Sequence, residues 1–524
     1  KPEFVGSGST PYALLGRSGL LGAGVDSLYG YTAPIKDILG NARPNPSGSN
    51  PDLGAFENSL GSSPYPDQVT GLKAKGGDGS VTLTWTKNSE SDVNKYYVYR
   101  HTESFTPAAG YAIDTVTTTT HTSTGLNNSA RYYFHVSAVN TSGYEGASAT
   151  VDITPTFNGP VWHVAVVDSG GNDSNEGSEA SPFNTFSHAV EHAANGDTII
   201  FGDGTYSGKD NRDIELNGSK SLVIKSRNGA SKTILDAGTY GRHINFKAWS
   251  DNDGQGTGTN YSNVDTNFQF IGLTFKNGIN SEDKQGGSIR IEGTMYNSSG
   301  TTTEYKISPK FKDCVFKNNG GLVVEKGGAI AIYRGDPVFE SCVFDTNLVF
   351  EKGGAVFVSE HSAPQFRNST FTGNQASYTT VEYNNGQPIW RNIGGGAIYM
   401  HNAQGIKIVN CTFSYNKAQT ATSNANGGAI EVSNNWFPSD DRQLIIDRST
   451  FSYNSAASTN SSAFGGAISA GSPITIQNSL FYENIIHATY HSEGGAIHIG
   501  IQTRTNQQTS QEENGESFLI NNTI

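Results

Sequence analysis

Two short sequence phrases alternate along the second half of this chain, and they constrain its fold more than any other feature. The first is Gly-Gly-Ala-Ile or a close variant, found at Gly286–Ile289, Gly327–Ile330, Gly353–Val356, Gly395–Ile398, Gly427–Ile430, Gly465–Ile468 and Gly494–Ile497. The second is Phe-x-x-Asn, found at Phe316/Asn319, Phe344/Asn347, Phe371/Asn374, Phe413/Asn416, Phe451/Asn454 and Phe481/Asn484. The tightest period is 353 − 327 = 26 residues. A constant core with insertions of variable length is typical of a solenoid, because loops accommodate the insertions.

Apolar residues recur at every second position inside each repeat, which predicts β-strands. One column after the glycines is apolar in every repeat: Ile289/Ile291, Ile330/Ile332, Val356/Val358, Ile398/Met400, Ile430/Val432, Ile468/Ala470 and Ile497/Ile499. The alternate column is mixed, so we expect one buried and one exposed face. It reads Arg290, Ala331, Phe357, Tyr399, Glu431, Ser469 and His498. Short strands in a turn of 26 residues leave no space for a covering helix, so a parallel β-helix is predicted.

Three residue types are interpreted as structural. The paired glycines are expected at the bends, where positive φ or close backbone approach is needed. The recurrent Asn is expected in a left-handed turn, with its side-chain amide bonded to the equivalent amide one coil away. Cys314, Cys342 and Cys411 occupy one column. A Cys314–Cys342 disulfide is the alternative, but in-register neighbours orient their Cβ atoms alike, so free thiols are favoured.

The alternation of Gly-Gly-Ala-Ile with Phe-x-x-Asn resembles the repeat of the polymorphic outer membrane proteins, a family of bacterial surface β-helix adhesins. The resemblance covers about half of the chain. It implies a right-handed parallel β-helix at a bacterial cell surface. The predicted fold class is therefore all-β: a right-handed parallel β-helix plus a fibronectin type III-like β-sandwich, for which the residues are given below.

The composition suits a solenoid, and the net charge argues against a nucleic-acid-binding protein. The chain has 524 residues, too many for one domain, and 62 of them are glycine. Hydrophobic residues make up 35%, which suits many turns around a thin core. The net charge of −13 argues against nucleic acid as a partner. No apolar run is long enough to predict a membrane span.

The first part of the chain divides at a Ser/Pro-rich linker. Residues 1–60 contain Asp37-Ile-Leu-Gly-Asn-Ala-Arg-Pro44 and Asp52-Leu-Gly-Ala-Phe-Glu57. They resemble the closing segment of bacterial β-helix proteins of the choice-of-anchor type. Residues 61–155 comprise the linker and a predicted sandwich of short strands. The Trp85 strand, the Tyr132-x-Phe134-x-Val136 corner and the closing Ala-Val-Asn-x-x-Gly resemble a fibronectin type III domain.

Residues 160–524 are predicted to form a second β-helix, which begins with a cap. From Phe183 to Ala194, apolar residues at Phe186, Ala189, Val190 and Ala193 share one helical face, and Asn184 or Thr185 can cap the helix. This order resembles the amino-terminal cap of many bacterial β-helix proteins. A capping helix covers apolar and backbone groups that the first coil would otherwise expose.

Two groups of residues are candidate binding sites. Asp168, Asn172, Asp173 and Glu176 form an oxygen-rich turn that is either a structural calcium site or an Asx-rich turn ahead of the helix, which we favour. Five aromatics lie in insertions between repeat strands, and they either bind a ligand or fold back over the coil: Tyr378, Tyr383, Trp390, Trp436 and Phe437.

Two functions compete. The leading hypothesis is a secreted or cell-surface structural and adhesive protein, with glycans or surface proteins as partners and no catalytic residues assigned. The alternative is a polysaccharide lyase or hydrolase on a β-helix scaffold. Such an enzyme would need a cluster of carboxylates next to a base, and the outward column does not show one. Arg290 and Glu292 share a strand and are interpreted as a solvated pair.

The two ends of the chain suggest assembly. Residues 1–60 look like the end of a β-helix, whereas residues 160–524 look like a β-helix that stops inside a strand. An open coil would expose unpaired backbone and an apolar cross-section. We therefore expect tandem repeats in a longer chain, or head-to-tail contact between copies. A repeated heterologous contact gives a filament.

Overall fold

The computed structural model describes residues 3–108, 112–128, 130–251, 259–298, 300–379, 383–384, 387–388, 391–433, 444–500, 503–505, 512–514 and 519–521. The chain forms two compact units, Lys1–Asn158 and Gly159–Ile524, and each is described by itself. Within the described ranges, no helix has the length and apolar character needed to cross a bilayer.

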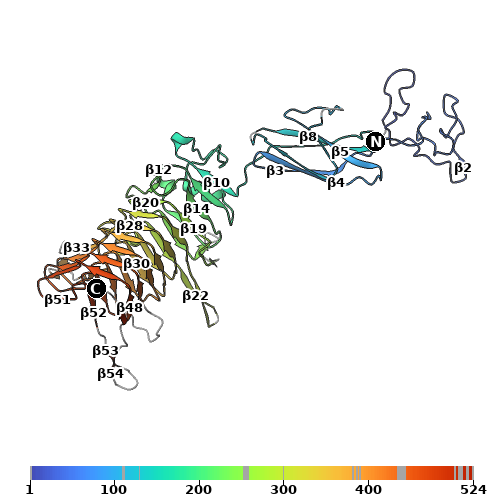
Figure 1. Ribbon diagram of the computed structural model, residues 1–524. Coiled ribbons are helices and arrows are strands. Elements are labelled where there is room, and N and C mark those ends of the chain that lie inside the picture. The colour runs from blue at the N-terminus through green and yellow to red at the C-terminus, as the bar shows by residue number, and fades with distance from the viewer. Residues whose placement is uncertain are drawn as a thin grey trace. The chain divides into compact units, whose positions relative to one another are not determined.

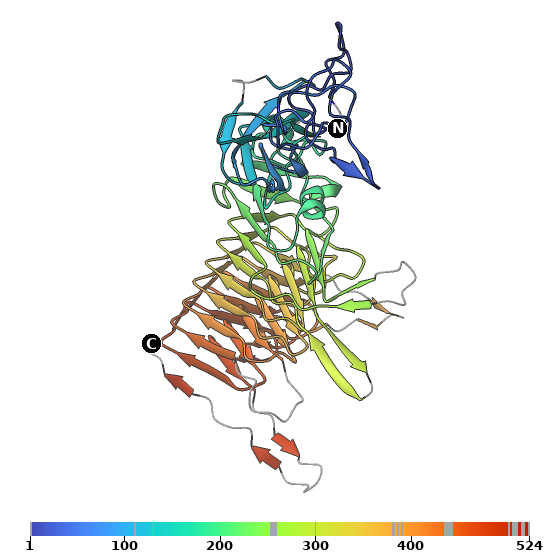
Figure 2. The same ribbon diagram turned by 90° about the vertical axis from the view of Figure 1, so that its right-hand side faces the viewer.

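The second unit is a parallel β-helix, whose strands stack as successive rungs in Figures 1 and 2. The first sheet contains β10 (Val161–Val164), β11 (Thr198–Phe201), β14 (Val223–Ser226), β19 (Gln269–Ile271), β24 (Lys310–Lys312), β27 (Val338–Glu340), β31 (Gln365–Arg367), β38 (Lys407–Val409), β43 (Leu444–Asp447), β48 (Ile474–Gln477) and β55 (Leu519–Asn521). Each strand pairs in parallel with its equivalent one coil away, as the repeat predicts.

Two further sheets complete each coil. The second contains β12 (Gly204–Tyr206), β15 (Thr233–Asp236), β20 (Thr274–Lys276), β25 (Val315–Lys317), β28 (Val343–Asp345), β32 (Thr370–Thr372), β39 (Thr412–Ser414), β44 (Thr450–Ser452) and β49 (Leu480–Tyr482). The third contains β13 (Ile214–Leu216), β16 (Ile244–Lys247), β21 (Ile289–Glu292), β26 (Ile330–Tyr333), β30 (Val356–Ser359), β37 (Ile398–His401), β42 (Ile430–Val432), β47 (Ile468–Ala470) and β52 (Ile497–Ile499).

Shorter strands extend the turns of the β-helix. One parallel sheet contains β29 (Leu348–Val349), β33 (Gln375–Tyr378), β40 (Lys417–Thr420), β45 (Ser455–Ser458) and β50 (Ile485–Ala488). Another contains β36 (Ile393–Gly394), β41 (Ala425–Asn426), β46 (Ala463–Phe464) and β51 (Ser492–Glu493). Antiparallel hairpins join β17 (Trp249–Asp251) to β18 (Thr259–Tyr261), β22 (Thr294–Ser298) to β23 (Thr301–Tyr305), β34 (Tyr383–Asn384) to β35 (Gln387–Pro388), and β53 (Thr503–Thr505) to β54 (Glu512–Asn514).

Stacked apolar side chains fill the β-helix. Ile330, Ile398, Ile430 and Phe413 are fully buried, which confirms the predicted inward column. The repeat phenylalanines stack face to face along the axis. Phe344 and Phe371 lie 4.5 Å apart between ring centroids, and Phe371 and Phe413 lie 4.6 Å apart. Because each ring contacts its equivalents, one repeat packs only against the repeats beside it. Cys314, Cys342 and Cys411 are buried free thiols, as favoured from the sequence.

The recurrent Asn forms a buried ladder, as predicted. Asn374 Nδ2 donates to Asn416 Oδ1 at 2.9 Å and to the carbonyl oxygen of Phe344 at 2.9 Å. Asn416 Nδ2 continues the ladder to Asn454 Oδ1 at 2.9 Å. The expected left-handed conformation belongs instead to the preceding residue, for example Tyr415 at φ 56°. The chain turns at that residue, which leaves the Asn side chain directed inward.

The β-helix begins with a short cap. After the turn η1 (Val167–Ser169), helix α1 spans Phe186–His192, which is shorter than predicted. Phe186 and Ala189 are its buried residues. Thr185 is the N-cap but makes no side-chain capping bond to the helix. The second turn, η2 (Lys209–Asn211), contacts α1, and Asn211 Oδ1 accepts a hydrogen bond from the Phe186 N–H at 2.9 Å.

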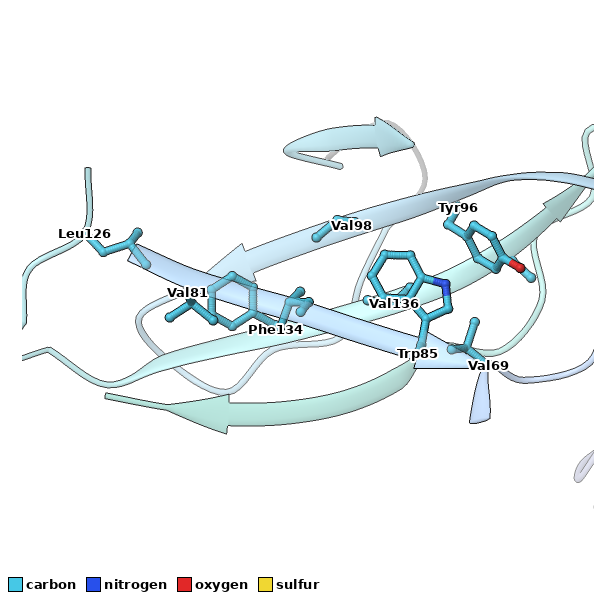
Figure 3. Close-up of a cluster of buried hydrophobic side chains, with 10 residues drawn as sticks. Val69, Val81, Trp85, Tyr96, Val98, Leu126, Phe134 and Val136 are labelled. Atoms are coloured by element: carbon cyan, nitrogen blue, oxygen red, sulfur yellow. The ribbon is translucent and has the colours of Figure 1, made fainter. Parts of the chain in front are cut away.

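The first unit contains a β-sandwich. One sheet contains β3 (Thr70–Gly77), β4 (Ser80–Thr86) and β7 (Thr120–Thr124). The other contains β5 (Val93–His101), β6 (Asp114–Val116), β8 (Tyr132–Asn140) and β9 (Ala149–Ile153). Figure 3 shows apolar side chains from both sheets meeting in the core, including Trp85, Tyr96 and Phe134. Trp85 packs edge-on against Tyr96 at 5.3 Å, so the predicted inward tryptophan is confirmed.

Residues 3–60 contain little regular structure. One hairpin, β1 (Ser27–Leu28) and β2 (Tyr31–Thr32), is present. Asp37 is buried, and its carboxylate accepts hydrogen bonds from the backbone N–H groups of Leu39 and Asn41 at 2.9 and 2.8 Å. Asp52 is also buried and accepts from Gly22 at 2.7 Å. These carboxylates hold together a segment with few apolar residues in its interior.

Candidate functional site

The outer face of the third sheet combines residues from strands and from the turns that precede them. We call one group the acidic–basic cluster: Arg242, Asp283, Arg290, Glu292 and Tyr333. Asp283 accepts from Arg242 Nη2 at 2.5 Å and from Arg290 Nη1 at 2.8 Å. The other nitrogen of Arg290, Nη2, lies 2.8 Å from Glu292 Oε1. One guanidinium therefore holds two carboxylates.

The environment separates the pKa values of these two carboxyl groups. Burial raises the pKa of Asp283, but the hydrogen bond and charge of Arg242 outweigh it, so the net pKa is lowered. Burial raises the pKa of Glu292 above its ordinary value, against the opposing charge of Arg290. Burial also raises the pKa of Tyr333, whose ring lies under the Arg290 guanidinium at 5.8 Å. Carboxyl groups with divergent pKa values can serve as an acid and a base.

A second group, the lysine–aromatic column, follows on the next coils: Lys326, Phe357, Lys352 and Tyr399. Lys326 Nζ lies 5.3 Å from the centre of the Phe357 ring, and Lys352 Nζ lies 4.8 Å from that of Tyr399. Lys326 and Lys352 pair in register between adjacent coils. The two rings stack 5.6 Å apart with an angle of 6° between their planes. Each lysine is thus held over an aromatic ring of the next coil.

The burial of this outward face contradicts one expectation from the sequence. We expected the outward face of these strands to be exposed, yet Ala331, Phe357 and Tyr399 are at most 4% exposed. They form a small apolar cluster on the outer side of the sheet, with Tyr333 packed against it. Stacking between coils and the overlying lysine side chains account for the burial, since a lysine stem can cover apolar surface while its ammonium reaches water.

Glu431 continues the column after Tyr399, with which it pairs in register. Its carboxyl group lies against the backbone of Gly394, where an added Cβ would contact Glu431 Oε2. Burial raises the pKa of Glu431 to about 8, although Lys352 and a 3.2 Å hydrogen bond from Asn426 Nδ2 act in the opposite direction. The column therefore combines two cations with a carboxyl group that is protonated near neutral pH.

One of the predicted aromatic binding residues, Tyr378, is buried in the structure. Tyr378 ends β33, is 1% exposed and packs edge-on against Phe350 at 4.8 Å. Its ring covers the coil, which is the second of the two alternatives. Trp390, Trp436 and Phe437 lie outside the described residues, and Tyr383 is described only as part of β34. For these four residues, ligand binding stays a prediction.

The predicted calcium turn is held by hydrogen bonds within the chain. Asp173 Oδ1 accepts from the N–H groups of Asn184 and Thr185 at 2.8 and 2.9 Å, just before α1. Asn172 Oδ1 accepts from Ser174, and Glu176 Oε1 accepts from Ser178. Asp168 lies in η1. This geometry accounts for the Asx-rich turn. Calcium stays a prediction, and the described ranges hold no group of three or more His, Cys, Asp and Glu side chains suited to a metal.

Sequence reasoning missed the acidic–basic cluster because two of its members come from turns. Arg242 and Asp283 are separated by 283 − 242 = 41 residues and precede equivalent strands on adjacent coils. Only the strand register reveals that they meet. The sequence signal that could have revealed these groups is a charged residue a few positions before the outward residues of a strand, as at Asp283, Lys326 and Lys352.

Two family models match parts of the chain. Residues 67–154 match the fibronectin type III domain. Residues 261–437 and 310–500 match a right-handed β-helix region. A protein of Bacillus subtilis, the uncharacterized protein YwoF, is 35% identical over 72 residues, which are 14% of this chain. The chain spans only 15% of the length of that curated relative.

Solved structures match parts of the chain. An Fn3-like protein from Clostridium thermocellum is 34% identical, and the match covers 16% of this chain and 86% of that one, with a TM-score of 0.14. The family 28 exopolygalacturonase of Yersinia enterocolitica is 10% identical over 83% of this chain and 99% of its own, with a TM-score of 0.19. Pectate lyase PelI of Erwinia chrysanthemi is 10% identical over 87% and 97%, with a TM-score of 0.14. At these TM-scores the likenesses carry no argument about function.

Proposed function

We propose that this chain, which contains a fibronectin type III domain and a right-handed β-helix region, is a secreted or cell-surface structural and adhesive protein of a bacterium. The resemblance of its repeats to polymorphic outer membrane proteins supports that origin. The β-helix is a rigid scaffold, because the Asn ladder and the stacked rings tie each coil to the next. Such a scaffold presents its outer face in a fixed geometry. Its ligand is an anionic glycan, bound along the lysine–aromatic column.

The column is the observation that carries this proposal. Lys326 and Lys352 repeat at the spacing of one coil, and both are partly exposed. The rings of Phe357 and Tyr399 restrict where the ammonium groups lie. Cations held in place lose less conformational freedom on binding than free lysines do. A chain of acidic sugars offers a matching row of negative charges, although the protein as a whole carries −13.

Removing both ammonium groups should weaken binding. We expect the double variant Lys326→Gln/Lys352→Gln to bind polygalacturonate about tenfold more weakly than the wild type, since each exposed ion pair is worth up to about 1 kcal/mol. Affinity electrophoresis of the full chain measures this. Lys310→Gln/Lys312→Gln is the matched control, because it removes the same charge from β24 in the first sheet. Equal losses in both variants, or equal binding to neutral dextran, would contradict a specific site.

The acidic–basic cluster supports the second candidate function, a polysaccharide lyase or hydrolase. Asp283 and Glu292 share Arg290 and have oppositely shifted pKa values. Incubation of the protein with uronic-acid polysaccharides gives an unsaturated, ultraviolet-absorbing product if it is a lyase, or new reducing ends if it is a hydrolase. Product that disappears in Glu292→Gln would establish this function over the adhesive one.

A further inference from the structure

Three successive strands of the second sheet, β32, β39 and β44, carry only hydroxyl side chains on their outer face. The phenylalanine of each strand lies inward, and the residues on either side of it form what we call the hydroxyl array: Thr370, Thr372, Thr412, Ser414, Thr450 and Ser452. The strands pair in register, so these side chains form two straight columns along the axis. All of them except Ser452 are at least partly exposed. Because a hydroxyl group both donates and accepts hydrogen bonds, the array offers both functions at regular intervals.

The hydroxyl array begins where the charged side chains of this face end. On the two preceding strands, β25 and β28, the outward column holds Lys317 and Asp345, which form a 2.8 Å ion pair. Asp345 is followed in register by Thr372, whose Oγ1 accepts a 3.2 Å hydrogen bond from the Ser414 hydroxyl. Adjacent coils lie about 4.8 Å apart. The array is therefore a straight, uncharged surface, which suits an extended ligand without charge.

Two exposed tyrosines border the hydroxyl array at the turn after these strands. Tyr415 and Tyr453 are 57% and 43% exposed, and their rings stack 5.0 Å apart with 4° between their planes. Both residues have positive φ, 56° and 54°. This conformation costs free energy for any residue with a side chain, and a bulky residue seldom adopts it. Strain that the local fold does not require is an indication of function.

The same turn on earlier coils shows that the fold does not require tyrosine there. The equivalent positions also have positive φ and hold Asn318, Thr346 and Gly373. Tyr453 covers one face of the Tyr415 ring, whereas Gly373 has no side chain to cover the other. The open ring face thus lies beside Thr372 and Ser414 of the hydroxyl array. An aromatic face next to a few polar groups is typical of ligand sites, and a sugar ring can place its C–H face on the ring and its hydroxyl groups on the polar side chains.

We propose that Tyr415, Tyr453 and the hydroxyl array bind a neutral, extended polysaccharide along the axis of the β-helix. A straight array fits an extended chain, because successive sugar units can contact equivalent side chains on successive coils. The absence of charge in the array favours a neutral sugar over a uronic acid. The inference goes beyond the proposed function, since it assigns a second ligand to a different sheet from that of the lysine–aromatic column.

Replacing both tyrosines tests the aromatic part of this surface. The variant Tyr415→Asn/Tyr453→Asn introduces the residue that the chain itself has at position 318 of the same turn, so the β-helix should fold, and circular dichroism checks this. Affinity electrophoresis of the full chain with hydroxyethylcellulose, a soluble β-1,4-linked glucan, measures binding. We expect binding about tenfold weaker than that of the wild type. Tyr240→Asn is the matched control, because Tyr240 is 80% exposed and lies at another turn of the β-helix.

A second variant removes hydroxyl groups and leaves both rings in place. Thr372→Val/Thr412→Val keeps the size and branching of the side chains, so the strands should be preserved. We expect it to bind hydroxyethylcellulose about fivefold more weakly than the wild type, because two hydrogen bonds to the ligand are lost. Dextran is the comparison ligand. Its flexible α-1,6-linked chain does not hold the sugar rings in a straight row, so the wild type should not bind it.

Four outcomes would overturn the proposal: a wild type that does not bind hydroxyethylcellulose, a wild type that binds dextran equally well, a tyrosine or threonine variant that binds like the wild type, or an equal loss in Tyr240→Asn. Polygalacturonate binding is measured in parallel and should be unchanged in both double variants. Lys326→Gln/Lys352→Gln should in turn bind hydroxyethylcellulose like the wild type. Failure of this surface is therefore distinguishable from failure of the lysine–aromatic column.

Discussion

Glu431 is a residue whose ionisation is coupled to the fold. Its carboxyl group lies against Gly394, and burial raises its pKa from 4.5 to about 8. The folded chain therefore binds this proton more tightly than the unfolded chain does. The stability linked to this group is complete below about pH 4.5 and is lost as pH rises through about 8.

Replacing Glu431 with Gln should flatten this pH dependence. Gln cannot ionise, so Glu431→Gln should lose less melting temperature than the wild type between about pH 5 and about pH 9. Thermal unfolding followed by circular dichroism measures the difference. Glu340→Gln is the control, because the hydrogen bond from Lys310 lowers the pKa of Glu340, so this group stays ionised over that range and its variant should keep the slope of the wild type. Equal slopes for the wild type and Glu431→Gln would contradict the assignment.

At the scale of the repeat element, the two glycines of each Gly-Gly-Ala-Ile phrase have different tasks. Gly395 has φ 62°, in the left-handed region. The φ of Gly396 is not in the left-handed region. A Cβ at this position would instead clash with the carbonyl oxygen of Gly428 on the next coil, and it would lie 2.5 Å from the backbone nitrogen of Lys417. The first glycine turns the chain, and the second allows neighbouring coils to approach.

Two substitutions separate these tasks. Gly396→Ala should cost about 3 kcal/mol, the upper end for an overpacked position, because backbone on both sides must move. Gly196→Ala should cost only about 1–2 kcal/mol, since Gly196 has φ 91° but open space around its Cβ position. Urea unfolding of the full chain gives both values. A smaller loss for Gly396→Ala than for Gly196→Ala would show that close approach is not what the second glycine provides.

The repeat pattern predicted the inward half of each element better than the outward half. The inward column, the Asn ladder and the parallel pairing follow from local sequence, because every coil imposes the same constraint on Ile398, Phe413 and Asn416. Burial of Phe357 and Tyr399 outside the sheet was not predictable in this way. It depends on which side chains the turns before each strand supply, such as Lys326 and Lys352, and the turn lengths vary.

At the scale of the whole molecule, the domain types were recognisable and the charge cluster was not. The sandwich has its own signature in Trp85 and Phe134, and the β-helix has its repeats. The acidic–basic cluster requires the register between coils 41 residues apart, from Arg242 to Asp283. A single sequence fixes that register only after the insertions have been assigned to loops.

The two units should unfold as separate transitions, because each has its own core. Leu83 is fully buried in the sandwich, and Leu83→Ala should cost about 2–5 kcal/mol there. That loss lowers the melting temperature of one transition by at least about 10 °C and leaves the other unchanged. Ile398→Ala, in the core of the β-helix, is the reciprocal variant and should move only the second transition. Differential scanning calorimetry of the full chain resolves both. A single transition that both variants shift would mean that the sandwich and the β-helix fold as one cooperative unit.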